Sequence, residues 1–450
     1  MTREMRALIV LLTAYGLRLT AGDSRLAAQE GSWQSEGYGY YLEVRNDSLR
    51  FHEVTAVSCI PTSRAKKVDA PTGAQAAYRL LDAPVTFLIL PTEGGRLRLH
   101  MNGAASDIVI RRGQRPAACD RTTPDTPTTN FDVFATTWAE QYGFFDLKGA
   151  DWKAIVAANR PRITGSSPPE SLFAVLSGMI EPLHDAHTFI RAGTVGRFGG
   201  ARKTANSLER ADFAKAYALT EQYLTLPVHK FCNGQLEFSM LADDIGYLRL
   251  RSFSGYHAGG FEAGLTALEA ALDTVFAKAS GWRGMVIDVR INGGGADPYG
   301  LTIASRLADA PYLAYTKEAR SDPNNPTRWT PGQDSRVVPS SRSGFKGPVV
   351  LLTGVHSVSA AETFTQALMH RTPRVTRVGE HTQGVFSDVL GRTLPNGWRF
   401  GLPNERFVTD GQTWDGPGIP PDVAVPVFAR SDLAAGKDVA LARALELVRR

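Results

Sequence analysis

Two short apolar runs separated by a helical pattern constrain this chain more than any other feature. GMVIDVR (residues 284–290) and PVVLLTG (residues 348–354) are nearly all apolar, which is typical of strands buried on both faces. The run IGYLRLRSF (residues 245–253) predicts a strand before them. Helical spacing of apolar residues over 261–275 and 301–307, and a further helix starting near Ala360, alternate with these strands. Alternating strands and helices predict an α/β layer.

Length and composition limit the remaining possibilities. At roughly 150 residues per domain, 450 residues allow about three domains and a sizeable core. The chain is 43% hydrophobic and 21% charged, as in ordinary globular proteins. Its net charge of +5 is spread without long blocks of one sign, which gives no support to a nucleic-acid partner. Its three cysteines contain no C-x-x-C pair, so neither a zinc site nor thioredoxin-like chemistry is predicted.

The N-terminus has the pattern of an export signal. Arg3 and Arg6 precede an apolar run over residues 7–17, which is too short to span a bilayer but suits the hydrophobic part of a signal peptide. We therefore predict a signal peptide over residues 1–28, a periplasmic or extracellular location and no integral membrane span. The alternative is a buried N-terminal helix.

The next segment predicts a small β domain over residues 29–120. Apolar and polar residues alternate there between turn signals, as in short antiparallel strands. In an oxidising compartment Cys59 and Cys119 could clasp this domain, leaving Cys232 unpaired. The Thr/Pro-rich stretch over residues 121–130 predicts a linker and a domain boundary.

Beyond the linker we predict a helical domain over residues 131–240, an α/β core over 241–430 and a C-terminal helix over 431–450. Aromatic residues from Phe131 to Phe145 recur at helical spacing, and a second helix opens at Ser167. Residues 194–235 are weakly periodic and receive no predicted structure.

Ser359 is the first candidate for chemistry. It lies where the apolar run 348–354 gives way to a helix, and a hydroxyl there sits at the positive end of the helix dipole. The N–H of Ala360 could stabilise an oxyanion formed when Ser359 attacks a carbonyl. The plainer alternative is a serine that only caps the helix.

A glycine-rich turn after residues 284–290 is the second candidate. Gly293, Gly294 and Gly295 let the backbone approach a ligand and direct N–H groups towards it, which could supply a second oxyanion donor. A tight turn or a phosphate cradle are the alternatives. Neither G-x-G-x-x-G nor G-x-x-x-x-G-K-[ST] is present, which disfavours the phosphate cradle.

The third candidate is His187 in HDAHTFI, just after a predicted helix. A lone histidine is more often structural than catalytic. His184 and His187 could also suggest a metal pair, but neither H-E-x-x-H nor a third ligand accompanies them.

Taken together, these motifs resemble the tail-specific, or C-terminal-processing, protease family of serine peptidases, including its tricorn-core-like branch. The chain has DAHT, DVRINGGG, SAAE, VGEHTQG and GIPPD in the family's order, over about residues 131–427. The resemblance implies a crotonase-like catalytic core preceded by a helical segment and a small β domain. It also implies a polypeptide substrate and no metal or other cofactor.

The resemblance further implies which residues act. The dyad branch uses a lysine at a position that is Val385 here, so a Ser–Lys dyad is absent. The tricorn-like branch uses a histidine base oriented by an acid, and these positions fall on His187 and Asp415. Gly294 and Ala360 would form the oxyanion hole, with Gly293 as an alternative to Gly294.

Three departures from the family pattern accompany these assignments. Ala186 stands where the tricorn-like branch has a serine, Asp415 replaces a glutamate, and residues 191–243 are too short for a PDZ module.

Two other functions remain open. A non-catalytic ligand-binding protein could use the same fold, since relatives include retinoid-binding proteins. An esterase-type acyl hydrolase would share the Ser–His–acid chemistry, although the G-x-S-x-G elbow of α/β-hydrolases is missing. Cleavage specificity and oligomeric state do not follow from the sequence.

Overall fold

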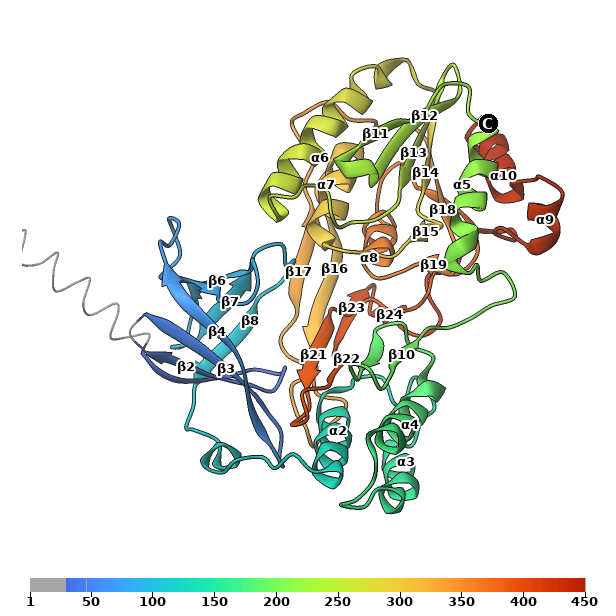
Figure 1. The fold of residues 1–450 in the computed structure, drawn as a ribbon. Helices are drawn as coiled ribbons and strands as arrows, with labels where there is room; N and C mark the ends of the chain where they lie inside the picture. The colour runs from blue at the N-terminus through green and yellow to red at the C-terminus, as the bar shows by residue number, and fades with distance from the viewer. Residues whose placement is uncertain (1–29, 46, 450) are drawn as a thin grey trace, which may run out of the picture. The chain divides into compact units, whose positions relative to one another are not determined.

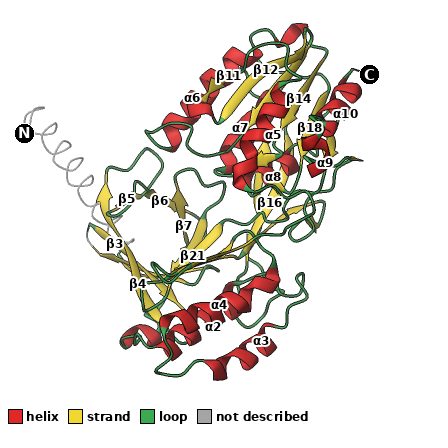
Figure 2. Cartoon of the chain, turned by 45° about the vertical axis from the view of Figure 1, so that its right-hand side comes forward, coloured by secondary structure: helices red, strands yellow, loops and turns green. Residues whose placement is uncertain are grey.

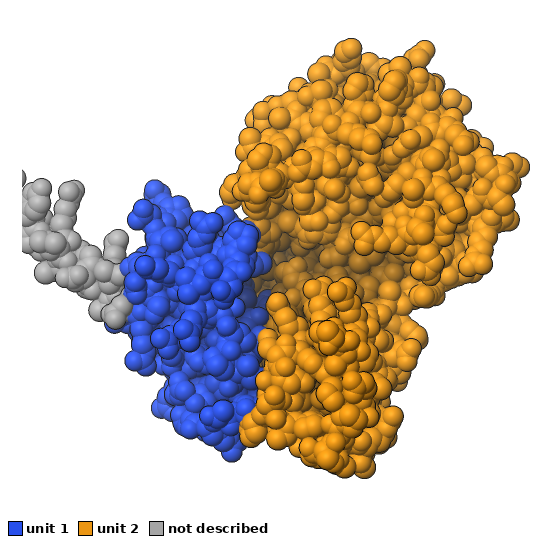
Figure 3. Space-filling model, in the orientation of Figure 1, with its two compact units in different colours: residues 1–102, 107–123 blue, residues 103–106, 124–450 orange. Residues whose placement is uncertain are grey.

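The computed structural model describes residues 30–45 and 47–449. The predicted signal peptide, residues 1–28, lies outside the described residues. The described chain divides into two compact units (Figure 3). Unit 1 holds residues up to 102 and residues 107–123, and unit 2 holds residues 103–106 and 124 onwards. The helical segment predicted as a separate domain therefore belongs to the same unit as the α/β core.

Unit 1 is a closed antiparallel β-barrel, which confirms the predicted β domain. Each strand pairs with the next one in sequence, and β8 closes onto β1. Alternate residues such as Trp33, Leu42 and Tyr78 are buried in the barrel core, as a period of two requires. The strands are β1 (Gly31–Ser35), β2 (Tyr40–Arg45), β3 (Ser48–Val54), β4 (Cys59–Val68), β5 (Ala76–Leu80), β6 (Thr86–Pro91), β7 (Leu97–Met101) and β8 (Ile108–Arg112).

A disulfide joins Cys59 and Cys119, the pair that the sequence suggested. Cys59 begins β4 and Cys119 lies in a 3₁₀ turn after β8, with the two Cα atoms 4.9 Å apart. Both residues pack against Tyr41 in a small buried cluster on the barrel. Cys232 is free and buried, and burial raises the pKa of its thiol to about 11.

Unit 2 is built on a seven-stranded sheet in the order β11-β12-β13-β14-β18-β20-β25 (Figure 1). The strands from β13 to β25 are parallel, whereas β11 and β12 are antiparallel additions at one edge. This confirms the predicted α/β layer. The strands are β11 (His229–Phe231), β12 (Leu236–Ala242), β13 (Ile245–Leu250), β14 (Gly284–Asp288), β18 (Val349–Thr353), β20 (Thr376–Gly379) and β25 (Val423–Ala424).

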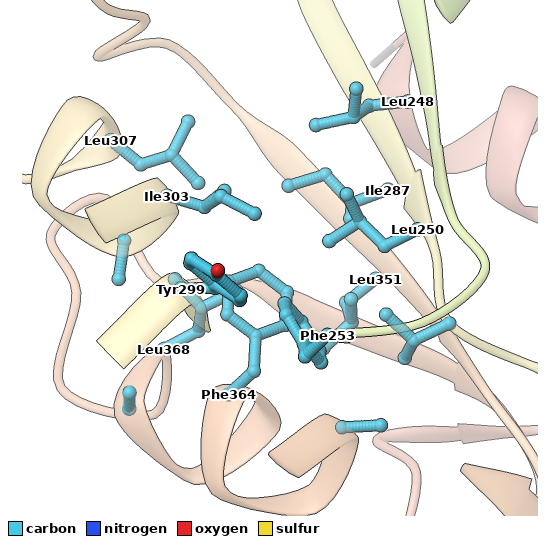
Figure 4. Close-up of a cluster of buried hydrophobic side chains, with 14 of the residues drawn as sticks. Leu248, Leu250, Phe253, Ile287, Tyr299, Ile303, Leu307, Leu351, Phe364 and Leu368 are labelled. Carbon is cyan, nitrogen blue, oxygen red and sulfur yellow. The ribbon is translucent and has the colours of Figure 1, made fainter. Parts of the chain in front are cut away.

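Helices cover both faces of this sheet. Successive residues of a strand point to opposite faces, and since the central strands are buried throughout, both faces must be covered. Met285 and Ile287 of β14 join one buried cluster, and Val286 between them joins another. The first cluster packs under α6 (Phe261–Phe276), α7 (Asp297–Leu307) and α8 (Ala360–Ala367). Figure 4 shows Ile303 and Leu307 of α7, Phe364 of α8 and Leu368 directly after α8 in this cluster. The second packs under α5 (Phe213–Glu221) and α10 (Val439–Val448), the latter preceded by α9 (Arg430–Ala434).

The helical segment begins earlier than predicted. α2 (Pro127–Gln141) starts inside the stretch predicted as a linker, residues 121–130, so that prediction was wrong over its last four residues. Pro127 fits the first helical position, and the side chain of Thr126 accepts a hydrogen bond from Thr129 N at 3.1 Å, which caps the helix. α3 (Trp152–Asn159) and α4 (Pro169–Ile180) follow, and α2 and α4 lie side by side (Figure 2).

Smaller sheets complete unit 2 and position the candidate residues. One has the order β10-β9-β22-β21, with β9 (Thr188–Arg191), β10 (Arg197–Gly200), β21 (Val389–Thr393) and β22 (Arg399–Pro403). Another has the order β17-β16-β23-β24, with β16 (Tyr312–Ala319), β17 (Gln333–Val337), β23 (Glu405–Thr409) and β24 (Gln412–Thr413). β15 (Ile291–Asn292) and β19 (His356–Ser357) form a short parallel pair. No helix in the described part of the chain has the length and apolarity needed to cross a bilayer.

Candidate active site

Ser359 occupies the predicted junction between a strand and a helix. It directly precedes α8 and adopts φ 57° and ψ −121°, a region that residues with a side chain seldom enter. Such backbone strain persists only where surrounding contacts hold it, and it is common at functional sites. The side chain is half-buried. The local geometry therefore matches a sharp turn that presents a hydroxyl at a helix N-terminus.

The glycine-rich turn lies directly against Ser359. Pairing of β15 with β19 places residues 291–292 beside 356–357, so the two turns that follow these strands meet. Gly294 has φ +84°, and a Cβ added to it would lie 2.6 Å from Ser359 Cβ and 3.0 Å from Ala360 N. A side chain at position 294 would therefore collide with the turn that carries Ser359. Gly294, Ser359 and Ala360, predicted from separate motifs, are brought together.

The N–H groups at this meeting point differ in their partners. Ala360 N–H, the first of α8, makes no hydrogen bond within the described residues. Gly294 N–H donates to Asn292 Oδ1 at 2.9 Å. Gly293 is exposed, and its N–H has no acceptor in the described chain. Within the described residues, the N–H groups of Ala360 and Gly293 are therefore unengaged, whereas that of Gly294 is engaged by Asn292.

Glu362 holds the serine turn, a role that the sequence reasoning missed. Its carboxylate is fully buried and accepts hydrogen bonds from Gly384 N at 2.6 Å, Val385 N at 2.9 Å and Ser359 N at 3.1 Å. Burial raises its pKa to about 8. A glutamate three residues after an N-cap serine is the signature of a capping box, so this signal was present in SAAE.

Residues 385–387, here called the connecting segment, contact all three members of the predicted triad. Val385 O accepts a hydrogen bond from Ser359 N at 3.2 Å. Phe386 N donates to Asp415 Oδ1 at 3.2 Å. The backbone of Ser387 faces the imidazole of His187. Ser359, Asp415 and His187, which are far apart in the sequence, therefore all lie next to the connecting segment.

Direct hydrogen bonds between the triad members are absent from the described structure. None joins Ser359 to His187 or His187 to Asp415. His187 is 7% exposed, its Nδ1 is buried without a partner, and its backbone N–H donates to Asp185 Oδ1 at 2.9 Å. Burial lowers the pKa of His187 below its ordinary value, and the negative charges of Asp185 and Asp388 partly offset this effect.

Asp415 has partners of its own. Its side chain is buried, with Oδ1 accepting from Phe386 N at 3.2 Å and Oδ2 accepting from Thr413 Oγ1 at 2.5 Å. Burial raises the pKa of Asp415 to about 7, despite these hydrogen bonds, and the nearby charge of Asp185 acts in the same direction. Asp415 thus fixes the connecting segment next to His187.

Comparison with known proteins identifies the chain. The sequence model of peptidase family S41 matches residues 244–425, which contain the glycine turn, Ser359 and Asp415. This match and the similar solved structures support membership of peptidase family S41. It is therefore a serine peptidase. A protein from Parabacteroides merdae ATCC 43184, assigned as a peptidase, is 26% identical, with a TM-score of 0.62 over 72% of this chain and 97% of that one.

Two structures named CPAF share the fold with this S41 peptidase. Mature CPAF is 12% identical, with a TM-score of 0.51 over 69% of this chain and 94% of that one. A mutant of CPAF is 13% identical, with a TM-score of 0.55 over 72% of this chain and 98% of that one.

Neither position 385 nor the buried Lys317 offers a lysine base in this serine peptidase. Val385, at the position of the dyad lysine, is buried and apolar. The buried Lys317 contacts Asp388 Oδ2 at 2.6 Å and Glu405 Oε1 at 3.2 Å. Burial opposes its charge, but Asp388 and Glu405 outweigh burial and hold the pKa of Lys317 above its ordinary value. Lys317 therefore stays protonated. Among the described residues, no three His, Cys, Asp or Glu side chains are grouped to hold a metal ion.

Proposed function

We propose that this serine peptidase cleaves unfolded or tail segments of polypeptides through an acyl-enzyme on Ser359, with His187 as general base, on a crotonase-like α/β core. The observation that carries this proposal is the meeting of Ser359, Gly294 and Ala360 at one strained turn. The connecting segment then brings that turn to His187.

The first half of the reaction forms the acyl-enzyme. Because burial lowers its pKa, His187 is neutral near pH 7 and accepts the Ser359 hydroxyl proton as Oγ attacks the scissile carbonyl. Ala360 N–H and an N–H of the glycine turn stabilise the oxyanion that forms. The C–N bond then breaks, and the leaving amine takes the proton from His187. Ser359 remains as an ester of the acyl part.

The second half returns the enzyme to its starting state. His187 takes a proton from water, which attacks the ester carbonyl, and it then returns a proton to Ser359 Oγ as the peptide acid leaves. The 7% exposure of His187 leaves little room for water until substrate arrives. Hydrogen bonds absent from a substrate-free enzyme commonly form in the substrate complex. Asp415 contributes by holding the connecting segment that faces His187.

We also propose that the protein is exported. The disulfide between Cys59 and Cys119 supports this, because such bonds persist in oxidising compartments. The basic and apolar N-terminal pattern over residues 1–17 supports it too.

The test is the release of peptides from an unstructured protein, detected by mass spectrometry, with the chain beginning after residue 28. We expect cleavage by the parent and none by Ser359→Ala, since loss of a triad nucleophile costs about a millionfold in rate. Ser359 should also react with a fluorophosphonate.

Failure of this test would select between the two alternatives. Hydrolysis of small esters without peptide cleavage would favour an esterase-type hydrolase. No labelling and no hydrolysis would favour a ligand-binding protein.

A further inference from the structure

A histidine base needs a nearby carboxylate to stabilise its protonated form, and Asp415 makes no hydrogen bond to the His187 ring in the site described above. A general base carries a positive charge after it takes the serine proton, and a nearby carboxylate stabilises that imidazolium. Asp415 already uses both of its oxygens, on Phe386 N and Thr413 Oγ1, and makes no hydrogen bond to His187. Its pKa of about 7 also leaves it only partly ionised at neutral pH.

Asp388 and His187 lie at the same end of one sheet, each directly before a strand. β9 starts one residue after His187 and β21 starts one residue after Asp388, and both strands flank β22 antiparallel to it. The space above Gly401 of β22, where a Cβ would lie, is 2.3 Å from Phe189 Cε1 and 2.6 Å from Val389 Cγ1. These contacts show that the first residues of β9 and β21 lie close together across β22, with His187 and Asp388 directly before the two strands.

The carboxylate of Asp388 is also the least engaged of those near His187. Its Oδ2 contacts Lys317 Nζ at 2.6 Å, while its Oδ1 has no partner within the described residues. Its side chain is 56% exposed, whereas Asp185 and Asp415 are buried. Asp185 uses Oδ1 on the His187 backbone N–H and Oδ2 on Tyr142 Oη, at 2.9 and 3.2 Å. Of these three carboxylates, Asp388 is the one with an oxygen that no described residue contacts, and its exposure leaves it room to turn.

Buried groups keep Asp388 charged and in position. Lys317 is 3% exposed, and Glu405 Oε1 lies 3.2 Å from the same ammonium. Glu405 Oε2 accepts the backbone N–H of Asp388 at 2.8 Å, so one glutamate orders both partners. The part of Asp388 that the protein covers would raise its pKa, but the Lys317 ammonium outweighs this effect and holds that pKa below its ordinary value.

We infer that Asp388, held by Lys317 and Glu405, is the positioning residue whose carboxylate stabilises protonated His187. This role rests on the proposed function of His187 as general base. Of the charged and titratable groups around His187, Asp185 and Asp388 act on it directly. Lys317, Glu405 and Asp297 surround Asp388, while Tyr142 and Asp415 lie beyond Asp185.

The test is an NMR titration of His187 in the full described chain carrying Ser359→Ala. The Cε1 proton of His187 is assigned by its loss on adding His187→Gln. Adding Asp388→Asn should lower the pKa of His187 by about one unit, because removal of a nearby opposite charge disfavours the protonated ring. Asp388→Glu should largely restore it. Asp415→Asn, the matched control, should leave it unchanged.

Activity gives a second and separate readout. With Ser359 intact, the acid limb of the kcat/KM profile should move to lower pH in Asp388→Asn by the same amount as in the titration. An unmoved His187 pKa in Asp388→Asn, or a larger shift in Asp415→Asn, would overturn the inference. Should Asp388→Asn fail to fold, Asp388→Ser is titrated by the same criteria. A parent without peptidase activity would refute the proposed function, while the titration would still decide the role of Asp388.

Discussion

The serine side and the histidine side of the site are held in different ways. Around Ser359 nearly every backbone group has a fixed partner, through Glu362, Val385 and the close approach of Gly294. His187 has a fixed backbone N–H, but its buried ring Nδ1 has no partner among the described residues. In the proposed mechanism, the oxyanion side is thus built before substrate binds, whereas the proton-transfer side still has a hydrogen bond to form. This contrast predicts different responses to substitution.

The largest effect should come from the histidine side. His187→Ala removes the proton acceptor, so kcat should fall by about 10⁴-fold to 10⁶-fold in the peptide-release assay. Removal of this buried ring also leaves a cavity, so the variant should unfold at a lower temperature, and kcat is compared at a temperature where both proteins are folded. Retention of most activity in this variant would contradict the base assignment and point to another proton acceptor.

The next largest effect should come from the glycine turn. Gly294→Ala introduces a Cβ 2.6 Å from Ser359 Cβ at a residue with φ +84°, so the serine turn must move. The same Cβ would lie 3.0 Å from Ala360 N, so we expect a loss of about 10²-fold to 10³-fold in kcat, the cost of disturbing the proposed oxyanion donor Ala360.

Gly293→Ala is the matched control for that prediction. Its added Cβ meets nothing within 4 Å, and its φ is not in the left-handed region. Its kcat should stay within a few-fold of the parent. Equal losses in both variants would mean that the close packing of Gly294 on Ser359 is not what matters.

Glu362→Gln should lower kcat by less than Gly294→Ala, because it weakens the hydrogen bonds that hold the serine turn without forcing the turn to move. The amide can accept at one position only, so at least one of Ser359 N–H, Gly384 N–H and Val385 N–H loses its partner. An unsatisfied buried donor costs about 1–3 kcal/mol, or about tenfold to a hundredfold if it acts on kcat. The decisive measurement is kcat against KM, because a loose turn should lower kcat while leaving KM nearly unchanged.

The same variant should change how stability depends on pH. The folded pKa of Glu362 is raised to about 8, above the unfolded value of about 4.3, so the folded state binds its proton more tightly. The stability from this group is fully present below pH 4.3 and is lost as the pH rises through 8. Asp415 and Asp297, with pKa values raised to about 7, act in the same direction. Urea unfolding between pH 5 and 8 should therefore show a smaller fall in Glu362→Gln than in the parent.

The sequence predicted one side of the site better than the other. Ser359, Gly294 and Ala360 lie in short motifs at strand ends, and strand pairing forces such ends together. The α/β alternation, the β domain and the Cys59–Cys119 pair were likewise predictable from local patterns.

The histidine side depends on contacts that leave no local pattern. Asp388 and Lys317 are 71 residues apart and meet only because β16 and the start of β21 are brought together by Glu405 of β23. The engagement of Gly294 N–H by Asn292 is a side-chain orientation, which spacing does not encode. The start of α2 inside the predicted linker shows that threonine and proline also mark helix starts.

The smallest effect on catalysis should come from the disulfide. Its 60-residue separation predicts that Cys59→Ala with Cys119→Ala lowers the stability of the barrel by about 4 kcal/mol. Ser359, His187, Asp415 and Asp388 all belong to unit 2, so peptide cleavage at a temperature where unit 2 stays folded should be unchanged. Differential scanning calorimetry with and without the disulfide should show one transition that moves and one that does not, and Cys232→Ala should move neither substantially. A loss of activity in the double variant at that temperature would contradict the expectation that peptide cleavage depends on unit 2 alone.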